Sequence, residues 1–357
     1  FLKESLSLSY TLTGVILMTA NFTSSLIQPL LGFLSDKQDK PLLLPLGCFC
    51  SGLGLSLLAI PSSYIVVLGL VVISGLGVAS YHPEGYKTAY YFTGEKRATG
   101  MAIFSVGGNL GFALGPLIAI FVVKYFGLSS LPLIMLPSLL FPVILFFYWD
   151  KITSGRVDKK PAQETPHKIA GTTYLSLLIL VGIVMMRSWI QMGLMSYIPF
   201  YYIDYLQGDP LHAGALVSVF LMGGVFGTLG GSPLADRWGH QRYLTLSMLL
   251  ASIVLPLIFV ARGIFLFAVL GLLGMILIST FTVTVVMAQR LLPRNLGIAS
   301  GLMVGFAIGA GGFCVTLLGV IADSFGVPFA LKSISILPFI GFLLSLSLKY
   351  QRTPDRI

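Results

Sequence analysis

The chain has 357 residues, of which 56% are hydrophobic and only 10% are charged. Its mean hydropathy is +0.92, whereas a soluble domain has about 25% charged residues. These values exclude an ordinary soluble enzyme and predict an all-α polytopic membrane protein. The formal net charge of +9 does not indicate a nucleic-acid partner, because the Lys and Arg residues lie in short loops between apolar runs and form no basic stripe.

Apolar runs of about 20 residues predict transmembrane helices. We predict eleven of them in chain order, at Leu8–Leu34, Leu42–Ile60, Tyr64–Phe92, Ala98–Val123, Leu131–Trp149, Thr172–Tyr205, Ala213–Ala235, Tyr243–Val260, Ile264–Ala288, Ile298–Ile321 and Val327–Leu348.

A polar stretch at Asp150–Ala170 interrupts this series, carries two prolines and cannot lie in hydrocarbon. We predict that it links an N-terminal helix bundle (1–149) to a C-terminal one (171–357). Apart from Lys87 and Arg187, sixteen Lys and Arg residues fall on the linker side of the membrane, and four fall on the other side. The positive-inside rule therefore places the linker and the C-terminus in the cytoplasm.

The sequence repeats itself weakly with an offset of about 200 residues. "GFLSDKQDKPLLL" follows the first apolar run and "SPLADRWGHQRYL" follows the seventh, with Asp36 and Asp236 as matching acids. "KRATGMAIFSVGG" and "LPRNLGIASGLMVG" form a second pair. Two related halves joined by a polar linker indicate a duplicated transporter.

The acidic loops resemble the Gly-x-x-x-Asp-Arg/Lys-x-Gly-Arg/Lys-Arg/Lys signature of the major facilitator superfamily. The first copy is matched by Gly32, Asp36, Lys37 and Lys40, and the second by Asp236, Arg237, Gly239 and Arg242. Two positions depart from the signature. Ser232 stands where the second copy has its leading Gly, and Asp39 replaces the loop Gly of the first.

The run Tyr81–Leu117 resembles the fosmidomycin resistance branch of that superfamily, which carries His-Pro-Glu in helix 4 and Gly-Gly-Asn-x-Gly-x-Ala-Leu-Gly-Pro in helix 5. The resemblance implies the major facilitator fold of two pseudo-symmetric bundles, with helices 2–6 before the linker, helices 7–12 after it, and helix 1 of twelve missing. It also implies a monomer in the lipid bilayer of a bacterial inner membrane. Such a protein exports a small drug or metabolite by alternating access, driven by an inward flow of protons.

Charged residues inside an apolar span are costly and mark functional positions. Glu84 and His82 flank Pro83 in the third span, and we predict that they exchange the coupling proton. For Glu84 the alternative is a permanent structural pair with Lys87, three residues further along the helix, or with a neighbouring Arg. For His82 the alternative is a hydrogen-bonded packing role.

Arg187 lies near the middle of the sixth span, where an unpaired guanidinium is implausible. Its partner is either Glu84 or an anionic group of the substrate, because the guanidinium fork binds two oxygens of a phosphonate, phosphate or carboxylate. The alternative is a purely structural pair. Gln191, Asn109 and Lys87 complete the predicted substrate-binding set, whereas Trp189 is predicted to pack.

Two further groups concern conformational change. We predict a cytoplasmic latch of helix-end charges at Asp36, Arg97, Asp236, Arg237 and Arg294, the alternative being simple solvation or topology. Glycines at every fourth position predict close helix contacts where the halves slide, with ordinary packing as the alternative. They are Gly107, Gly111 and Gly115, then Gly223, Gly227 and Gly231, and finally Gly301, Gly305 and Gly309.

Two other functions remain open at this point. One is a proton-coupled uptake symporter of the same fold for a small anionic metabolite. The other is a non-transporting membrane sensor or scaffold, in which all buried charges would pair off. The sequence contains no nucleophile elbow, phosphate-binding loop or metal-type His pair, so no catalytic residue, cofactor or metal is predicted.

Overall fold

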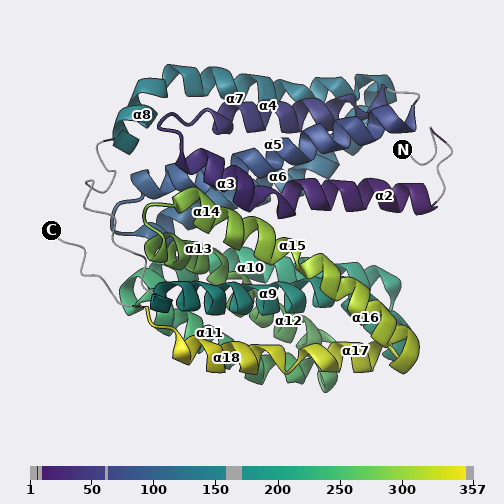
Figure 1. Cartoon of the computed structure of the whole chain (residues 1–357). Coiled ribbons are helices and arrows are strands. Elements are labelled where there is room, and N and C mark those ends of the chain that lie inside the picture. Colours follow the sequence, from purple (N-terminus) through teal and green to yellow (C-terminus); the bar gives the residue numbers. More distant parts are fainter. Residues whose placement is uncertain (1–5, 7–9, 61–62, 158–170, 351–357) are drawn as a thin grey trace. The chain divides into compact units, whose positions relative to one another are not determined.

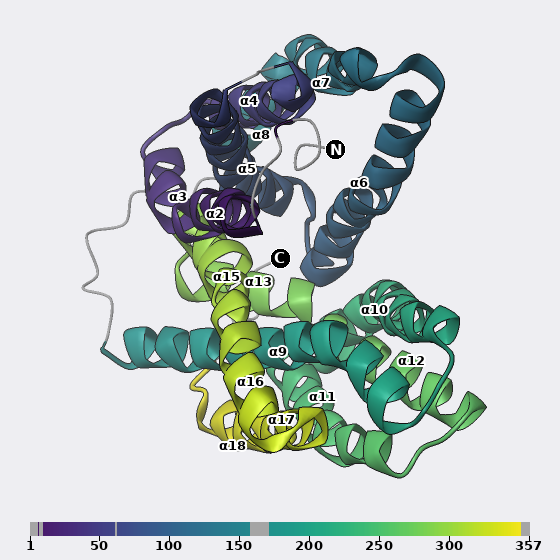
Figure 2. The ribbon, with the colours of Figure 1, turned by 90° about the vertical axis from the view of Figure 1, so that its right-hand side faces the viewer.

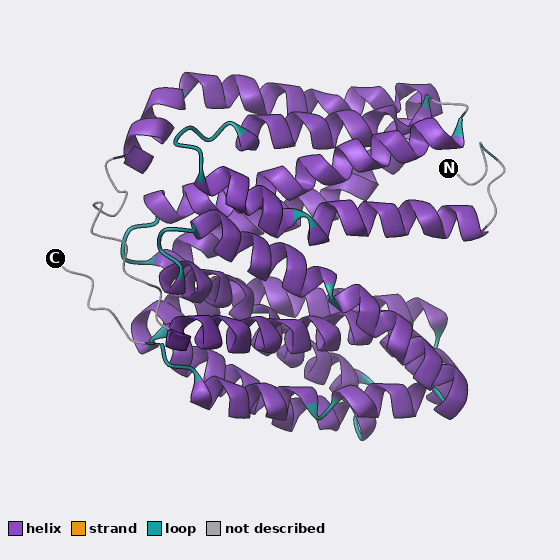
Figure 3. Ribbon diagram, in the orientation of Figure 1, coloured by secondary structure: helices purple, strands orange, loops and turns teal. Residues whose placement is uncertain are grey.

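The computed structural model describes residues 6, 10–60, 63–157 and 171–350, and every regular element in this part of the chain is a helix (Figure 3). The predicted all-α class is therefore confirmed. Within these residues, eight helices are long and apolar enough to cross a membrane, and Leu43–Ala59 is a shorter apolar helix. The eight are Tyr64–Phe92, Leu128–Phe147, Thr173–Tyr205, His212–Trp238, His240–Phe259, Ile264–Leu291, Leu296–Phe325 and Val327–Ser347. The count of eleven spans stays a prediction.

The chain forms two compact units. Unit 1 comprises the described residues of Phe1–Phe92, Phe104–Gln163 and Leu292–Gly309, and unit 2 those of Thr93–Ile103, Glu164–Leu291 and Ala310–Ile357. Each unit thus takes one short segment from the opposite half of the sequence. The predicted bundle boundaries at 149 and 171 stay a prediction.

Unit 1 is built around α5 (Tyr64–Phe92), the helix that carries His82 and Glu84. Figure 1 shows α4 along one side of α5 and α7 beyond α4, as their contacts also indicate. Apart from α6, which is described below, the other elements before the linker are α2 (Tyr10–Asn21), η1 (Phe22–Leu26), α3 (Gln28–Asp36), α4 (Leu43–Ser56), η2 (Leu57–Ala59), η3 (Leu128–Met135), α7 (Leu136–Phe147) and α8 (Trp149–Val157). The first part of the predicted linker is therefore helical, and residues 158–170 lie outside the described chain.

Unit 2 is built around α9 (Gly171–Phe200), which packs against α10, α13, α16 and α18 (Figure 2). Its core includes apolar side chains such as Leu180, Ile183 and Leu216 at 0% exposure, and it also contains buried polar groups, among them Arg187 and Gln289. The elements after α9 are η4 (Tyr201–Tyr205), α10 (Pro210–Trp238), α11 (His240–Val254), η5 (Leu255–Phe259), α12 (Ile264–Ile278), α13 (Thr280–Leu291), α16 (Gly311–Phe325), α17 (Val327–Ile334) and α18 (Leu337–Ser347).

Two runs of helix pass from one unit to the other. The first is α6 (Arg97–Phe126), which begins in unit 2 and continues in unit 1 beyond Ile103. The second runs through α14 (Leu296–Ser300), the π-helix η6 (Gly301–Phe306) and α15 (Ala307–Gly309) in unit 1 and enters α16 in unit 2. The first run begins at the "KRATG" segment of the sequence repeat, and the second begins at the "LPRNLG" segment.

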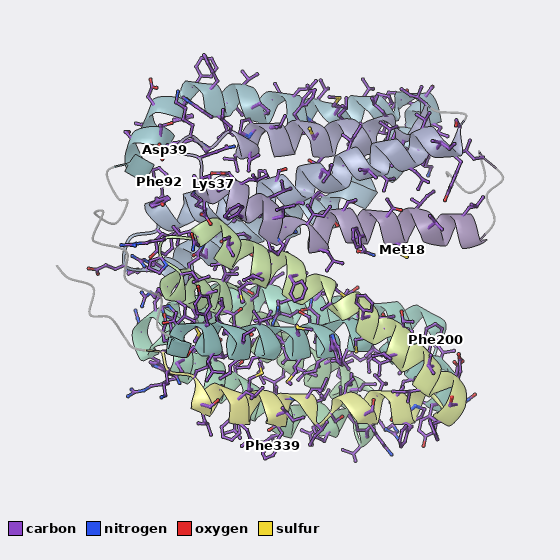
Figure 4. The ribbon with its side chains drawn as sticks, viewed as in Figure 1. Met18, Lys37, Asp39, Phe92, Phe200 and Phe339 are labelled. Atoms are coloured by element: carbon purple, nitrogen blue, oxygen red, sulfur yellow. The ribbon has the colours of Figure 1, made fainter. Side chains whose placement is uncertain are left out.

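Large apolar side chains cover the outside of both units. Ile65, Phe147 and Ile264 are 77%, 79% and 85% exposed, and Figure 4 shows Phe339 projecting outward from α18. Side chains of this kind on long helices suit hydrocarbon better than water. The exposed apolar surface therefore fits a protein whose solvent is lipid.

Glycine ends α10 at the second signature loop. Gly239 has a φ of +97°, a backbone conformation that residues with a Cβ rarely adopt. Asp39, in the first loop, needs no such conformation, because Gln207 is the only non-glycine residue with positive φ in the described chain. The departure from glycine at Asp39 is therefore tolerated by the local backbone.

Candidate functional site

Asp36, at the end of α3, caps the start of α14. The N–H groups of Gly297 and Ile298 donate to its Oδ1 and Oδ2 atoms at 2.8 and 2.9 Å. The first N–H groups of a helix have no partner within the helix, and a carboxylate also complements the positive end of its dipole. Asp36 therefore closes a helix end that lies 261 residues away in the sequence.

Lys87 binds residues at the same end of α3. Its ammonium donates to the carbonyl oxygen and the hydroxyl of Ser35 and lies 3.6 Å from Asp36 Oδ1. The side chains of Lys87 and Asp36 are only 4% and 6% exposed. The pKa of the Asp36 carboxyl is raised above its ordinary value of 3.8, because the effect of burial exceeds that of the two helix N–H groups and the Lys87 ammonium, which lower the pKa.

Asp236 repeats the arrangement in unit 2, where it caps α6. The N–H groups of Ala98 and Thr99 donate to its carboxylate at 3.0 and 2.9 Å, and the Thr99 hydroxyl adds a bond of 2.7 Å. His240 Nε2 lies 3.1 Å from Asp236 Oδ1, and its Nδ1 lies 3.5 Å from the hydroxyl of Tyr350. Each acid of the sequence repeat thus caps a helix from the opposite half of the chain.

The predicted latch arginines lie beside these caps. Arg97 is the first residue of α6 and donates from Nε to the carbonyl of Gly94 at 3.3 Å. Arg237 directly follows Asp236 and is exposed, and Arg294 is exposed two residues before α14 begins. All three therefore sit at helix ends near the caps, as their sequence positions predict.

Glu84 and His82 lie in the C-terminal half of α5, and the helix continues through Pro83. Glu84 is 0% exposed. The Nδ1 atom of His82 is buried and has no hydrogen-bond partner among the described residues, and its ring meets Tyr81 edge-on, with 6.0 Å between the ring centroids. Glu84 is thus fully buried and His82 partly buried, and both lie within two turns of helix before Lys87; their role in proton exchange stays a prediction.

Arg187 is buried in the middle of α9, with 2% exposure. Its Nη1 donates weakly to Gln191 Oε1 at 3.4 Å, and its guanidinium lies 5.7 Å from the centre of the Phe281 ring. Its Nε atom has no hydrogen-bond partner within the described chain, and no carboxylate of unit 2 forms an ion pair with it there. Arg187 is therefore a buried cation without an ion-pair partner among the described residues of its own unit.

The other predicted binding residues differ in their surroundings. Gln191 lies beside Arg187, as described above. Asn109 is exposed on α6, and Lys87 meets Ser35 and Asp36 near the C-terminal end of α5. Within unit 2 the structure places Gln191 beside Arg187, whereas Asn109 and Lys87 belong to unit 1. The assignment of the set to substrate binding stays a prediction.

The three glycine ladders have different neighbours. A Cβ at Gly107, Gly111 or Gly115 would meet no atom within 4 Å. On α10, a Cβ at Gly223 or Gly227 would collide with the carbonyls of Gly271 and Met275 on α12, and one at Gly231 with the Tyr243 hydroxyl. In unit 1, a Cβ at Gly301 would come within 2.6 Å of the Gln28 carbonyl. The second and third ladders therefore hold backbones together inside their own units.

Several partners of these residues were not predicted from the sequence. Thr99, His240 and Tyr350 gather around Asp236, and Ser35 accepts from Lys87. One signal could have pointed to the caps: in both halves the acid and the start of the capped helix keep the repeat offset of about 200 residues. The hydroxyl and imidazole partners carry no such signal.

A family model described as Major Facilitator Superfamily matches residues 1–208 and, a second time, residues 177–356. The chain belongs to the major facilitator superfamily. It is therefore a multi-pass integral membrane protein with the fold of a transporter and not of an enzyme. No group of three or more metal-binding side chains occurs among the residues that the structure describes.

Two curated proteins of this superfamily are similar to the chain. The uncharacterized MFS-type transporter YfnC of Bacillus subtilis (strain 168) is 36% identical over 352 residues, which cover 96% of this chain and 85% of the relative. The fosmidomycin resistance protein of Escherichia coli (strain K12) is 31% identical over 346 residues, with the same coverage of 96% and 85%. The resemblance to the fosmidomycin resistance branch is thereby confirmed.

The fold matches a solved member of the superfamily. The crystal structure of FucP, described as a major facilitator transporter in the outward conformation, superposes with a TM-score of 0.73 at 16% identity, covering 98% of this chain and 93% of that one. At this identity the likeness concerns the fold alone. It confirms the predicted major facilitator architecture.

Proposed function

We propose that this transporter is a proton-coupled exporter of a small anionic compound, which it carries by alternating access. Arg187 carries the proposal. A guanidinium buried in the middle of a spanning helix needs a counter-charge, and among the described residues of unit 2 its polar and ring contacts are with Gln191 and Phe281 only. An anionic cargo such as a phosphonate would supply that charge through bonds to two of its oxygens.

The direction of transport rests on a relative. A protein that is 31% identical over 96% of the chain confers fosmidomycin resistance by its name, and resistance is what export of the drug would produce. Fosmidomycin is a phosphonate, so the named drug also has the charge that Arg187 would bind. Fosmidomycin itself is therefore the first compound to test.

Glu84 and His82 are the proposed proton carriers. Both lie in α5, where Glu84 is fully buried and the Nδ1 atom of His82 is buried without a partner among the described residues. Lys87, one helical turn further along, bonds to Ser35 and Asp36. A change of charge at Glu84 would therefore act on the cap of α14 through a short path along one helix.

The two capped helix ends form the proposed latch. Asp36 and Asp236 each satisfy two backbone N–H groups, and such bonds can form in one conformation and break in another. On this proposal Lys87 belongs to the latch because its ammonium is already held by Asp36 and Ser35.

The proposal is tested with the full chain in inside-out proteoliposomes with an acidic interior. We expect radiolabelled fosmidomycin to accumulate inside against its gradient, and protons to leave. Collapse of the pH gradient should abolish the accumulation. Accumulation only with an acidic exterior would instead identify an uptake symporter. A lack of fosmidomycin and inorganic phosphate transport under both gradients would contradict an anionic cargo of this kind.

A further inference from the structure

The helical run that begins at Leu296 changes partners halfway along. Its first part, α14 and η6, packs on α3 in unit 1, and its last part, α16, packs on α9 in unit 2. Between them Ala310 forms a turn that separates α15 from α16, drawn as a short teal segment in Figure 3. The passage from unit 1 to unit 2 falls at this turn, after Gly309.

The start of α16 is held on α9 by side chains. The indole N–H of Trp189 donates to the carbonyl of Ala310 at 3.0 Å, and the Tyr197 hydroxyl donates to the carbonyl of Val315 at 2.8 Å. The thiol of Cys314 adds a weak contact of 3.8 Å to the Trp189 carbonyl. Two side chains that lie eight positions apart on α9 thus bind two backbone positions of α16.

The two helices also approach closely here. A Cβ at Gly311, the first residue of α16, would come within 2.9 Å of Met192 and 3.3 Å of the Ser188 carbonyl. A contact this tight leaves α16 little room to slide along α9. The hydrogen bond from Trp189 therefore acts on a helix start that is already fitted to its partner.

The segment before the turn combines a π-helix with glycines that pack closely on Ser25 and Gln28 of unit 1. Residues Gly301–Phe306 form a π-helix that contains Gly305, and Gly309 follows four residues later. Wider π turns and glycines are common places for a helix to bend. At this break the indole of Trp189 binds the carbonyl of Ala310, the N-cap of α16, and so ties the start of that helix to α9.

We propose that Trp189 is a positioning residue that fixes the first turn of α16 on α9 and so confines bending of this helix to the junction at Gly309–Ala310. The use of such a bend in transport rests on the proposed alternating access. The hydrogen bond and its local effect do not depend on that function and can be measured in the resting protein.

The first test is amide hydrogen exchange of the full chain in detergent, comparing wild type, Trp189→Phe and Tyr197→Phe. The loss of one hydrogen bond corresponds to about a five-fold change in a local opening equilibrium. We expect Trp189→Phe to accelerate exchange about five-fold in peptides that cover residues 307–314, with little change in α12. Tyr197→Phe should act further along, beyond Val315. Trp149→Phe, in unit 1, is the matched control and should change neither region.

The second readout is transport of fosmidomycin in proteoliposomes. The hydrogen bond from Trp189 is expected to affect the conformational step of transport and not the binding of the drug. Trp189→Phe should therefore change the turnover number about five-fold and leave the half-saturating concentration unchanged. Unchanged exchange at residues 307–314 would overturn the inference, as would acceleration spread over all of unit 2. If wild type does not carry the drug, the proposed cargo fails and the exchange result alone decides the role of Trp189.

Discussion

Gly32 and Gly297 face each other where α3 meets α14, and a Cβ on either residue would overlap the carbonyl oxygen of the other. A side chain at Gly297 would also come within 3.1 Å of Asp36 Oδ1. The cap on α14 therefore depends on two glycines that let the backbones touch.

Gly297→Ala should lower the free energy of unfolding by about 1–3 kcal/mol, the usual cost of overpacking a close contact. Denaturation of the purified protein in detergent measures this change. Gly69→Ala on α5 is the control, because a Cβ there would meet no atom within 4 Å, and alanine should be neutral or stabilising in that helix. An equal loss in both variants would contradict the close contact.

Asp36 and Lys87 should show energetic coupling. Asp36→Asn keeps one oxygen acceptor for two N–H donors and removes the ion pair, so we expect a loss of about 1–3 kcal/mol in unfolding free energy. In a double-mutant cycle with Lys87→Met, the coupling should be about 0.5–3 kcal/mol. Additive effects of the two changes would show that the 3.6 Å separation contributes nothing.

Two threonines test the Asp236 cap with the same substitution. The Thr99 hydroxyl donates to Asp236 at 2.7 Å, whereas Thr88 Oγ1 is buried without a hydrogen-bond partner in the described chain. Thr99→Val should therefore lower the unfolding free energy by about 1 kcal/mol, and Thr88→Val should be neutral or stabilising. Denaturation midpoints in detergent distinguish the two variants, and the reverse order would refute the assignment.

Glu84→Gln should uncouple transport from the proton gradient. The amide keeps the size of the carboxyl but cannot gain or lose a proton near neutral pH. We expect exchange of fosmidomycin down its own gradient to continue while accumulation against it stops. Glu95→Gln, at an exposed loop position, is the matched control and should behave as wild type. Undiminished accumulation in Glu84→Gln would remove this residue from coupling.

Arg187→Gln should weaken the apparent affinity for an anionic cargo about ten- to one-hundred-fold, because a hydrogen bond to a charged group contributes about 1.5–3 kcal/mol. Arg187→Lys keeps the positive charge but loses the forked guanidinium, so its affinity should lie between that of wild type and that of Arg187→Gln. Concentration dependence of fosmidomycin uptake in vesicles measures both. Equal affinity in all three proteins would show that Arg187 does not meet the cargo.

The sequence predicts the family, the all-helical class and the two acids of the repeat, because hydropathy and local signatures depend on neighbouring residues. It does not predict which atoms Asp36 meets, since Gly297 is 261 positions away and only packing brings them together. Lys87 shows a second limit. The position of Lys87 along α5 can be predicted from the sequence. Its partner Ser35 cannot, because tertiary contacts decide which residue its ammonium meets.

The exchanged segments have a consequence for how the protein is made. Asp36 obtains its two N–H donors only from Leu292–Gly309, the segment that completes unit 1. A ribosome synthesises this segment after nearly all the other helices have left it. During synthesis the Asp36 carboxylate is therefore made long before its N–H donors. It stays hydrated until α14 has been synthesised and its backbone amides replace that water.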